Sequence, residues 1–164
     1  MCVALCCVTA YISFPLPFTP GYVTALTFAL SLSAYLLPPR QTFTVILIYI
    51  LMGAVGLPVF AGGEGLSRLV GPAGGFYFAW IPAYALLSLA KGAEPNFKRY
   101  LLMNILIAVP ITYVGGVISM MCVLDVDLLQ ALTMAVLPFI PGDLMKATAA
   151  TALGVKVQKI MGGR

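Results

Sequence analysis

The sequence contains no histidine, and its four cysteines lack the C-x-x-C spacing of metal and redox sites. Without histidine, a serine–histidine triad and a histidine general base are excluded. Thiols at this spacing, with no imidazole to join them, predict that no metal is bound. We expect the cysteines to be packing residues: Cys2, Cys6, Cys7 and Cys122.

Charged residues are also scarce. They make up 9% of the chain, against 62% hydrophobic residues and a mean hydropathy of +1.05, and no long polar segment interrupts the apolar runs. This composition predicts an all-α integral membrane protein with one domain, residues 1–164, and no separate soluble domain. At about 20 residues per crossing, the length predicts a bundle of six transmembrane helices in the lipid bilayer. The predicted spans are 2–14, 21–37, 42–57, 71–90, 97–123 and 142–158.

The basic residues are not spread evenly. With the amino end inside, six crossings place seven of the nine Lys and Arg residues in the cytoplasm, leaving Arg68 in an outer loop and Lys146 within the last span. This pattern predicts a multi-pass protein of the cell membrane with both termini cytoplasmic. The net charge of +4 then reflects orientation and not a nucleic-acid partner. The cytoplasmic set is Arg40, Lys91, Lys98, Arg99, Lys156, Lys159 and Arg164.

Glycine and proline divide the chain. The densest glycine segment is 53–75, and its apolar residues would be poorly placed in water. Irregular backbone at membrane depth is tolerated where it is buried in protein or lines a cavity, so we expect this outer loop to fold back over a binding cavity. The alternative is an ordinary surface loop. Pro110 predicts a kink in the fifth span, and 125–141 shows the spacing of a short amphipathic helix over the outer mouth.

The last span contains a carboxylate and an ammonium three residues apart, Asp143 and Lys146. Ionisable residues within membrane spans are costly and usually mark a functional site. Pro141 suits the first helical turn, where Asp143 would also be stabilised by the helix dipole, so helix capping alone is an alternative. A second alternative is an internal ion pair without a ligand. We favour a pair that faces an outward cavity and binds a substrate.

Three segments resemble the signatures of a known family. LPVFAGG at 57–63, followed by GPAGG at 71–75, resembles the loop signature of the BioY family, the biotin-specific substrate-binding (S) subunits of energy-coupling-factor (ECF) transporters. PFIPGDLMK at 138–146 resembles the family's second signature, and ISFPLP at 12–17 is a weaker match. The chain departs from the family where Leu26 replaces a usual glutamine and where Ala73 and Phe76 replace Thr and Tyr.

The resemblance implies a ligand and its contacts. Biotin has a ureido ring with two N–H donors and one carbonyl acceptor, and an apolar chain that ends in a carboxylate. We assign Asp143 to the ureido N–H groups and Lys146 to a ligand oxygen, with the carboxylate preferred over the ureido carbonyl. Arg68 is a second candidate for the carboxylate. Further binding candidates are the loop glycines Gly62 and Gly63 and the wall residues Tyr77, Tyr84 and Asn104.

The energy for transport must come from other chains. The sequence lacks the G-x-x-x-x-G-K-[ST] motif, so it has no phosphate-binding loop of that type. The resemblance implies a transmembrane coupling subunit and two ATP-binding subunits as partners. Small residues four apart allow close helix approach, and Cys6 and Ala10 are a degenerate match to the family's Ala-x-x-x-Ala docking motif. Packing inside the subunit is the alternative for this pair.

These patterns favour high-affinity biotin capture and uptake, with biotin as the transported ligand and no cofactor. A subunit for another small vitamin is one alternative. A membrane-embedded enzyme that uses Asp143 and Lys146 as acid and base is a second, disfavoured because the spans offer no histidine and no further acid. A purely structural bundle subunit is the third.

Overall fold

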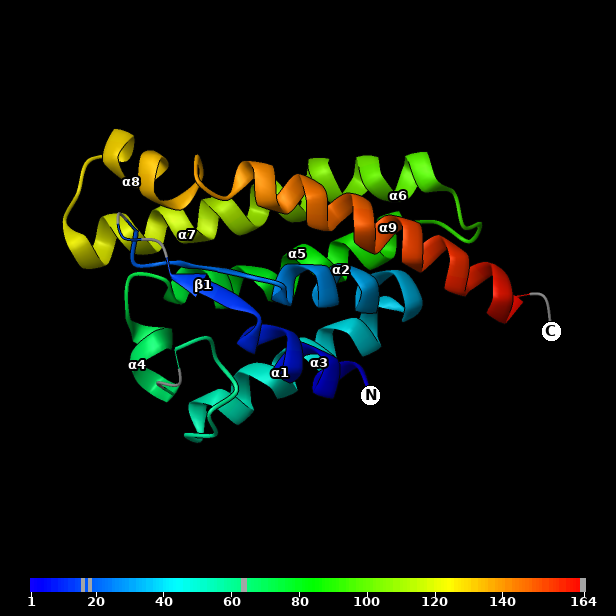
Figure 1. The fold of residues 1–164 in the computed structure, drawn as a ribbon, viewed down its shortest axis with the longest axis horizontal. Coiled ribbons are helices and arrows are strands. Elements are labelled where there is room, and N and C mark those ends of the chain that lie inside the picture. The colour runs from blue at the N-terminus through cyan, green and yellow to red at the C-terminus, as the bar shows by residue number, and fades with distance from the viewer. Residues whose placement is uncertain (16, 18, 63–64, 163–164) are drawn as a thin grey trace.

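The computed structural model describes residues 1–15, 17, 19–62 and 65–162, and within them the chain is mostly helical (Figure 1). Gly63 and Glu64 of the predicted loop lie outside the described residues. The elements in chain order are α1 (Cys2–Tyr11), β1 (Ser13–Pro15), β2 (Tyr22–Thr24), α2 (Leu26–Leu36), α3 (Pro39–Ala54), α4 (Gly65–Val70), α5 (Gly74–Ala90), α6 (Phe97–Met103), the π-helical segment η1 (Asn104–Ala108), α7 (Val109–Leu124), α8 (Leu128–Ala135) and α9 (Ile140–Gly162).

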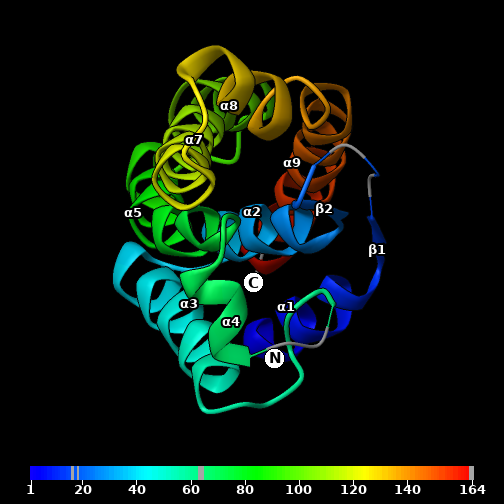
Figure 2. The ribbon, with the colours of Figure 1, turned by 90° about the vertical axis from the view of Figure 1, so that its left-hand side faces the viewer.

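The helices form an elongated bundle around α2. In the end-on view, α2 lies near the middle, with α5, α7, α8 and α9 to one side and α1, α3 and α4 to the other (Figure 2). The main helix pairs are α5 with α7, α2 with α9, and α3 with α5. Eight α2 residues are buried, including two serines. Both serine hydroxyls bond to the carbonyl four residues earlier, which removes the cost of burying them (Ser31 to Thr27, 2.8 Å; Ser33 to Ala29, 2.8 Å).

The structure has a helix at each of the six predicted spans, but it does not confirm six membrane crossings. Among the described residues, one continuous helix is long and apolar enough to cross on these grounds, Phe97–Leu124 with 28 residues. A second candidate is the pair Leu128–Ala135 and Ile140–Met161, which is bent by 46°. The first two helices have 10 and 11 residues, well short of the about 20 that a full crossing needs.

A short antiparallel ribbon corrects the all-α prediction. The first predicted span ends early, because α1 stops at Tyr11 and Ser13–Pro15 pairs with Tyr22–Thr24. Proline lacks an N–H and biases the preceding residue toward extended backbone, so the prolines between spans one and two favour this ribbon over helix. β-branched and aromatic residues in the second strand favour the same conformation.

Where the sequence predicted a kink at Pro110, the structure has a π-helical turn directly before this proline. α6, η1 and α7 run on as one helix, and Pro110 lies in the first turn of α7, directly after η1. Proline lacks the N–H that an α-helix needs, and a π-bulge is one way for a helix to accommodate that loss. The predicted amphipathic helix within 125–141 is confirmed as α8.

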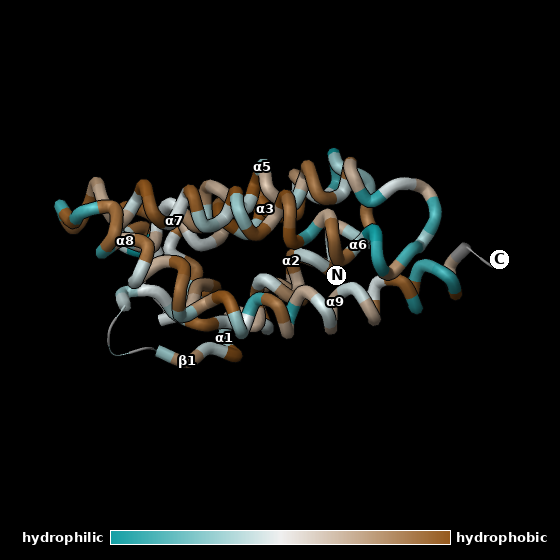
Figure 3. The backbone as a smooth tube through the Cα atoms, turned by 90° about the horizontal axis from the view of Figure 1, so that it is seen from above, coloured by the Kyte–Doolittle hydropathy of each residue, from teal (hydrophilic) through white to brown (hydrophobic). Residues whose placement is uncertain are grey.

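The hydropathy of the chain fits a bilayer environment along the bundle and water at its ends. Hydrophilic residues gather at the two ends of the long axis, while the middle of the bundle is mainly apolar (Figure 3). Large apolar side chains point outward from several helices, including Leu51 of α3, Phe78 of α5 and Val114 of α7, which are 54%, 54% and 58% exposed. An apolar outer surface of this extent is typical of a protein that faces lipid.

At the end of the bundle away from α4 and α8, the Lys91 ammonium caps α2. Its Nζ donates to the carbonyls of Ala34 (2.7 Å), Tyr35 (2.7 Å) and Leu37 (2.6 Å). These carbonyls lie at the negative end of the helix dipole, where a cation is favourable. Burial lowers the pKa of Lys91 to about 8, so the side chain is mostly protonated at pH 7 and keeps all its donors.

Candidate functional site

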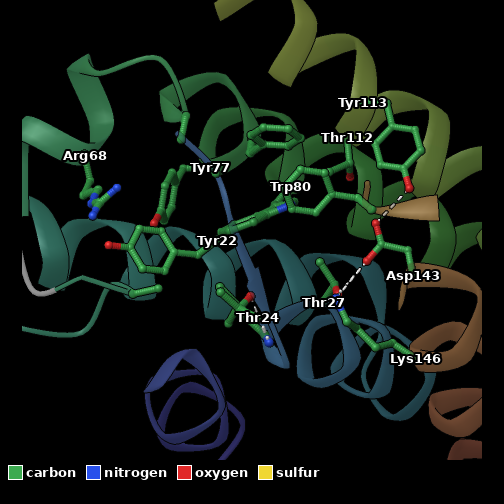
Figure 4. A pocket seen from close by; sticks show the side chains of 16 residues that line it. Tyr22, Thr24, Thr27, Arg68, Tyr77, Trp80, Thr112, Tyr113, Asp143 and Lys146 are labelled. Atoms are coloured by element: carbon green, nitrogen blue, oxygen red, sulfur yellow. Dashed lines mark hydrogen bonds and ion pairs between the residues drawn. The ribbon is translucent and has the colours of Figure 1, made fainter. Parts of the chain in front are cut away.

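A largely apolar pocket lies at the α4 end of the bundle, between β2, α2, α4, α5, α7 and α9. It holds about 620 Å³ of space not filled by protein atoms, part of it open to the surroundings. Its lining is mainly aromatic and aliphatic, with a few charged and hydroxyl groups (Figure 4). The lining residues are Gly21, Tyr22, Thr24, Leu26, Thr27, Ala61, Arg68, Ala73, Phe76, Tyr77, Trp80, Thr112, Tyr113, Phe139, Asp143 and Lys146.

Asp143 stands at one end of this pocket, in the first turn of α9. Pro141 precedes it in the same turn, as predicted, and the Asp143 N–H donates to Phe139 O at 2.8 Å. Its carboxylate accepts from three side chains: Thr27 Oγ1 at 3.4 Å, Tyr113 OH at 2.9 Å and Lys146 Nζ at 3.0 Å. A carboxylate offers about four acceptor positions, so about one remains for a ligand.

Lys146 forms the predicted ion pair with Asp143, one helical turn away. The Lys146 and Asp143 side chains are 18% and 12% exposed, so both are largely shielded from water yet border the pocket. A second, smaller pocket continues inward from the pair and shares four residues with the main one. The shared residues are Thr27, Thr112, Asp143 and Lys146.

Arg68 stands at the opposite end of the pocket, on α4 (Figure 4). Its guanidinium lies over the Tyr22 ring of β2, with Cζ 4.6 Å from the ring centroid. Its Nε is buried and has no hydrogen-bond partner among the residues that the structure describes. Gly62 makes room for this side chain, because a Cβ on Gly62 would lie 2.1 Å from an Arg68 terminal nitrogen, and its φ of +89° suits glycine. Gly62 therefore leaves room for Arg68, and it is not among the residues that line the pocket.

The described part of the loop before α4, residues 55–62, packs against the bundle. Phe60 is 1% exposed and occupies space left by Gly53, where a Cβ would lie 2.0 Å from the Phe60 ring. Tyr49 OH donates to Val59 O at 3.0 Å, and Tyr11 OH donates to Pro58 O. The prediction fails for three apolar residues of this region that remain exposed: Leu57, Leu66 and Val70.

The predicted wall residues divide between the two pockets. Tyr77 lines the main pocket and packs between Phe60, in a tilted arrangement (4.6 Å between ring centroids), and Trp80, edge to face (4.7 Å). Tyr84 and Asn104 line only the inner pocket, and Asn104 donates to Ser31 Oγ and to Tyr35 OH, both at 2.9 Å. The prediction for Gly63 falls outside the described residues.

Several pocket residues had no signal in the sequence. Tyr113 and Thr27 were not predicted, although both bond to Asp143, because nothing in the sequence indicates which faces of α2, α7 and α9 converge. Tyr22, Trp80 and Thr112 were missed for the same reason. Trp80 is the exception, because as the only tryptophan in the chain it could have been considered as a binding residue.

The docking prediction for Cys6 and Ala10 is wrong for this conformation. Both residues are 0% exposed, because their face of α1 packs into the core of the subunit. A side chain with no accessible surface makes no contact with another chain. The small residues of α1 instead allow close packing inside the subunit, which was the alternative. The exposed face of α1 contains Ala4, Val8 and Tyr11.

A mostly apolar pocket with a shielded ion pair at one end and an arginine at the other, in a helical bundle with an apolar outer surface, is typical of a membrane protein with a small-molecule site. The comparisons with known proteins agree with this class. The chain belongs to the BioY family, whose model matches residues 1–163. The family resemblance predicted from the sequence is thereby confirmed.

Individual relatives cover most of the chain. A biotin transporter BioY from Thermotoga maritima is 33% identical over 158 residues, which are 96% of this chain and 91% of the relative. A probable biotin transporter BioY from Bacillus subtilis is 31% identical over 149 residues, 89% and 80% of the two chains. The crystal structure of an S-component for biotin from an ECF-type ABC transporter has the same fold, with a TM-score of 0.87 at 23% identity, covering 96% of this chain and 87% of that one.

Proposed function

We propose that this protein binds biotin with high affinity and is the substrate-specific subunit of an ATP-driven ECF uptake transporter. The observation that carries the proposal is the Asp143–Lys146 pair opening onto an aromatic pocket in a chain of the BioY family. Biotin is then the transported ligand, and no residue of this chain is assigned a catalytic role.

The polar groups of the pocket complement those of biotin. The remaining acceptor position of the Asp143 carboxylate suits a ureido N–H. Arg68 Nε and the Trp80 indole N–H are buried donors without a partner in the described part of the chain, and biotin offers acceptors in its carbonyl and its carboxylate. The aromatic side chains between these groups suit the ring system and the apolar chain.

The position of Lys146 favours a change in one assignment. Lys146 Nζ lies 3.0 Å from Asp143, so a ligand group that reaches both must place an acceptor next to its N–H donor. The ureido carbonyl meets this condition, whereas the carboxylate lies at the far end of the molecule. We therefore assign Lys146 to the ureido carbonyl and Arg68, at the other end of the pocket, to the carboxylate.

Charge placement supports an orientation. Met1 and Cys2 border a groove with Arg40, and Lys91 bonds to Leu37 in the same region, so the amino end and several basic residues share one end of the bundle. We propose that this end is cytoplasmic and that the pocket opens outward. Delivery inward then requires a transmembrane coupling subunit and two ATP-binding subunits, because the chain lacks a phosphate-binding loop of the Walker type.

Equilibrium binding of labelled biotin to the purified protein in detergent tests the function. We expect tight binding, competition by unlabelled biotin and recovery of unchanged biotin. Absence of binding, with tight binding of another vitamin, would replace the ligand. Recovery of a chemically altered ligand would support the membrane-embedded enzyme instead.

A further inference from the structure

Three buried polar side-chain atoms have no hydrogen-bond partner among the described residues: Arg68 Nε, Trp80 Nε1 and Thr112 Oγ1. All three belong to residues that line the main pocket. Buried polar groups are nearly always bonded, and each exception requires an explanation. Their concentration in one pocket indicates that the missing partner is a ligand.

Thr112 is the most informative of the three because its environment offers it an easy partner. Helical Ser and Thr hydroxyls can bond to the carbonyl four residues earlier. Six such bonds form elsewhere in the described chain, at distances from 2.7 to 3.2 Å. Thr112 lies inside α7 and is 5% exposed, yet it makes no such bond.

Thr112 lies where a second hydrogen-bond acceptor beside Asp143 would be required. Thr112 and Asp143 both border the main pocket and the inner pocket, so they face the same space (Figure 4). The Asp143 carboxylate already accepts three bonds from the protein, which leaves about one acceptor position. A ureido ring presents two N–H donors, so a second acceptor is required.

We propose that Thr112 is a specificity-determining residue whose Oγ1 accepts the ureido N–H that Asp143 does not take. The two residues together then require a ligand with two N–H donors on one ring. This assignment rests on the proposed function, since the ureido group belongs to biotin.

Thr112→Val tests the assignment, because it removes the hydroxyl and keeps the shape of the side chain. We expect biotin to bind about tenfold more weakly, since a ligand N–H is left buried without an acceptor. Thr112→Ser keeps the hydroxyl and should bind biotin within about twofold of the parent. Thr42→Val is a matched control, because Thr42 is also fully buried in a helix but bonds to Pro38 O and lies outside the pocket, so its biotin affinity should not change.

Two lactam analogues of biotin, each with one ureido N–H replaced by CH₂, identify the bond. The lactam that lacks the N–H bonded to Thr112 should bind equally well to Thr112→Val and to the parent. The lactam that keeps this N–H should still bind about tenfold more weakly to Thr112→Val than to the parent. Equal losses with both lactams, or a Thr112→Val variant that binds biotin like the parent, overturn the assignment while the proposed function stands. A parent protein that does not bind biotin overturns both.

Discussion

The same three helices, α2, α5 and α9, build two polar regions at opposite ends of the bundle, and the two regions treat their polar groups differently. At the pocket end, the ion pair borders a cavity, and nearby buried donors have no partner within residues 1–15, 17, 19–62 and 65–162. At the Lys91 end, the polar groups bond to one another. Lys91 caps α2, Ser88 Oγ donates to Leu37 O at 2.6 Å, and Gln158 Nε2 donates to Tyr35 O at 2.6 Å.

The difference separates binding from stability. A polar network that satisfies itself stabilises the bundle and has nothing left to offer a ligand. Polar groups left unpaired beside a cavity cost stability in the empty protein and regain it when a ligand bonds to them. Variants at the pocket end should therefore change affinity more than stability, and variants at the Lys91 end should do the reverse.

The largest expected effect is that of Asp143→Asn. The amide keeps the shape of the side chain, but it presents a donor toward a ureido N–H and leaves the Lys146 ammonium unpaired. Because a hydrogen bond to a charged acceptor contributes about 1.5–3 kcal/mol and the amide also opposes the ligand N–H with a donor, biotin should bind at least ~100-fold more weakly in an equilibrium assay. Asp125→Asn makes the same change at an exposed αL position that asparagine tolerates, and it should bind like the parent. Parent-like affinity in Asp143→Asn would reduce Asp143 to a helix cap.

Lys91→Met is the counterpart at the other end. It keeps the apolar stem but removes one donor from each of three carbonyls at the end of α2. Tyr35 O keeps its bond from Gln158 and Leu37 O keeps its bond from Ser88, whereas Ala34 O loses its side-chain donor, at a cost of about 1–3 kcal/mol that outweighs the relief of burying one ammonium. We expect a loss of about 2 kcal/mol in stability, visible as a lower thermal midpoint without ligand, and biotin affinity within about twofold of the parent. Lys98→Met removes an exposed cation from the same region and should change neither property. A large loss of affinity in Lys91→Met would break the separation of the two ends.

Arg68→Met and Lys146→Met sharpen the comparison within the pocket. If Arg68 holds the carboxylate, Arg68→Met should weaken biotin by about tenfold or more, while biotin amide, which lacks that carboxylate, should lose much less. Lys146→Met should weaken acid and amide alike, because its partner is the ureido carbonyl. The opposite result, with Lys146→Met discriminating between acid and amide, would return the carboxylate to Lys146. Arg40→Met, an exposed arginine at the other end, controls for loss of positive charge.

The sequence predicted the chemistry of this site better than its shape. Asp143 and Lys146 could be identified because a charged pair is rare in apolar surroundings and because their spacing places them on one helix face. Arg68 was identified as the other outer cation. The residues that complete the site, Tyr113 and Thr27, are ordinary helix residues whose role depends on how α2, α7 and α9 face one another.

For the fold too, the sequence predicted the elements better than their lengths and neighbours. Apolar runs predicted where the six main helices lie, but not that the first two are short or that the prolines between them form a ribbon. Small-residue spacing on α1 predicted close packing correctly but not the partner, since the same pattern serves packing within a subunit and between subunits. Asn104 was predicted as a wall residue. It borders the inner pocket, but its amide bonds belong to the self-satisfied network around Tyr35.

The smallest expected effects come from removing one hydroxyl at each end, which makes the same chemical change in both regions. Tyr113→Phe takes one of three donors from Asp143, so we expect biotin to bind about three- to tenfold more weakly with little change in the thermal midpoint. Tyr35→Phe removes a buried hydroxyl that bonds to Thr151 at 3.0 Å and to Tyr100 O at 3.1 Å. It should cost about 1 kcal/mol of stability and leave affinity within about twofold. Equal effects of the two variants on affinity would show that the ends are coupled, and the division between a binding end and a structural end would then fail.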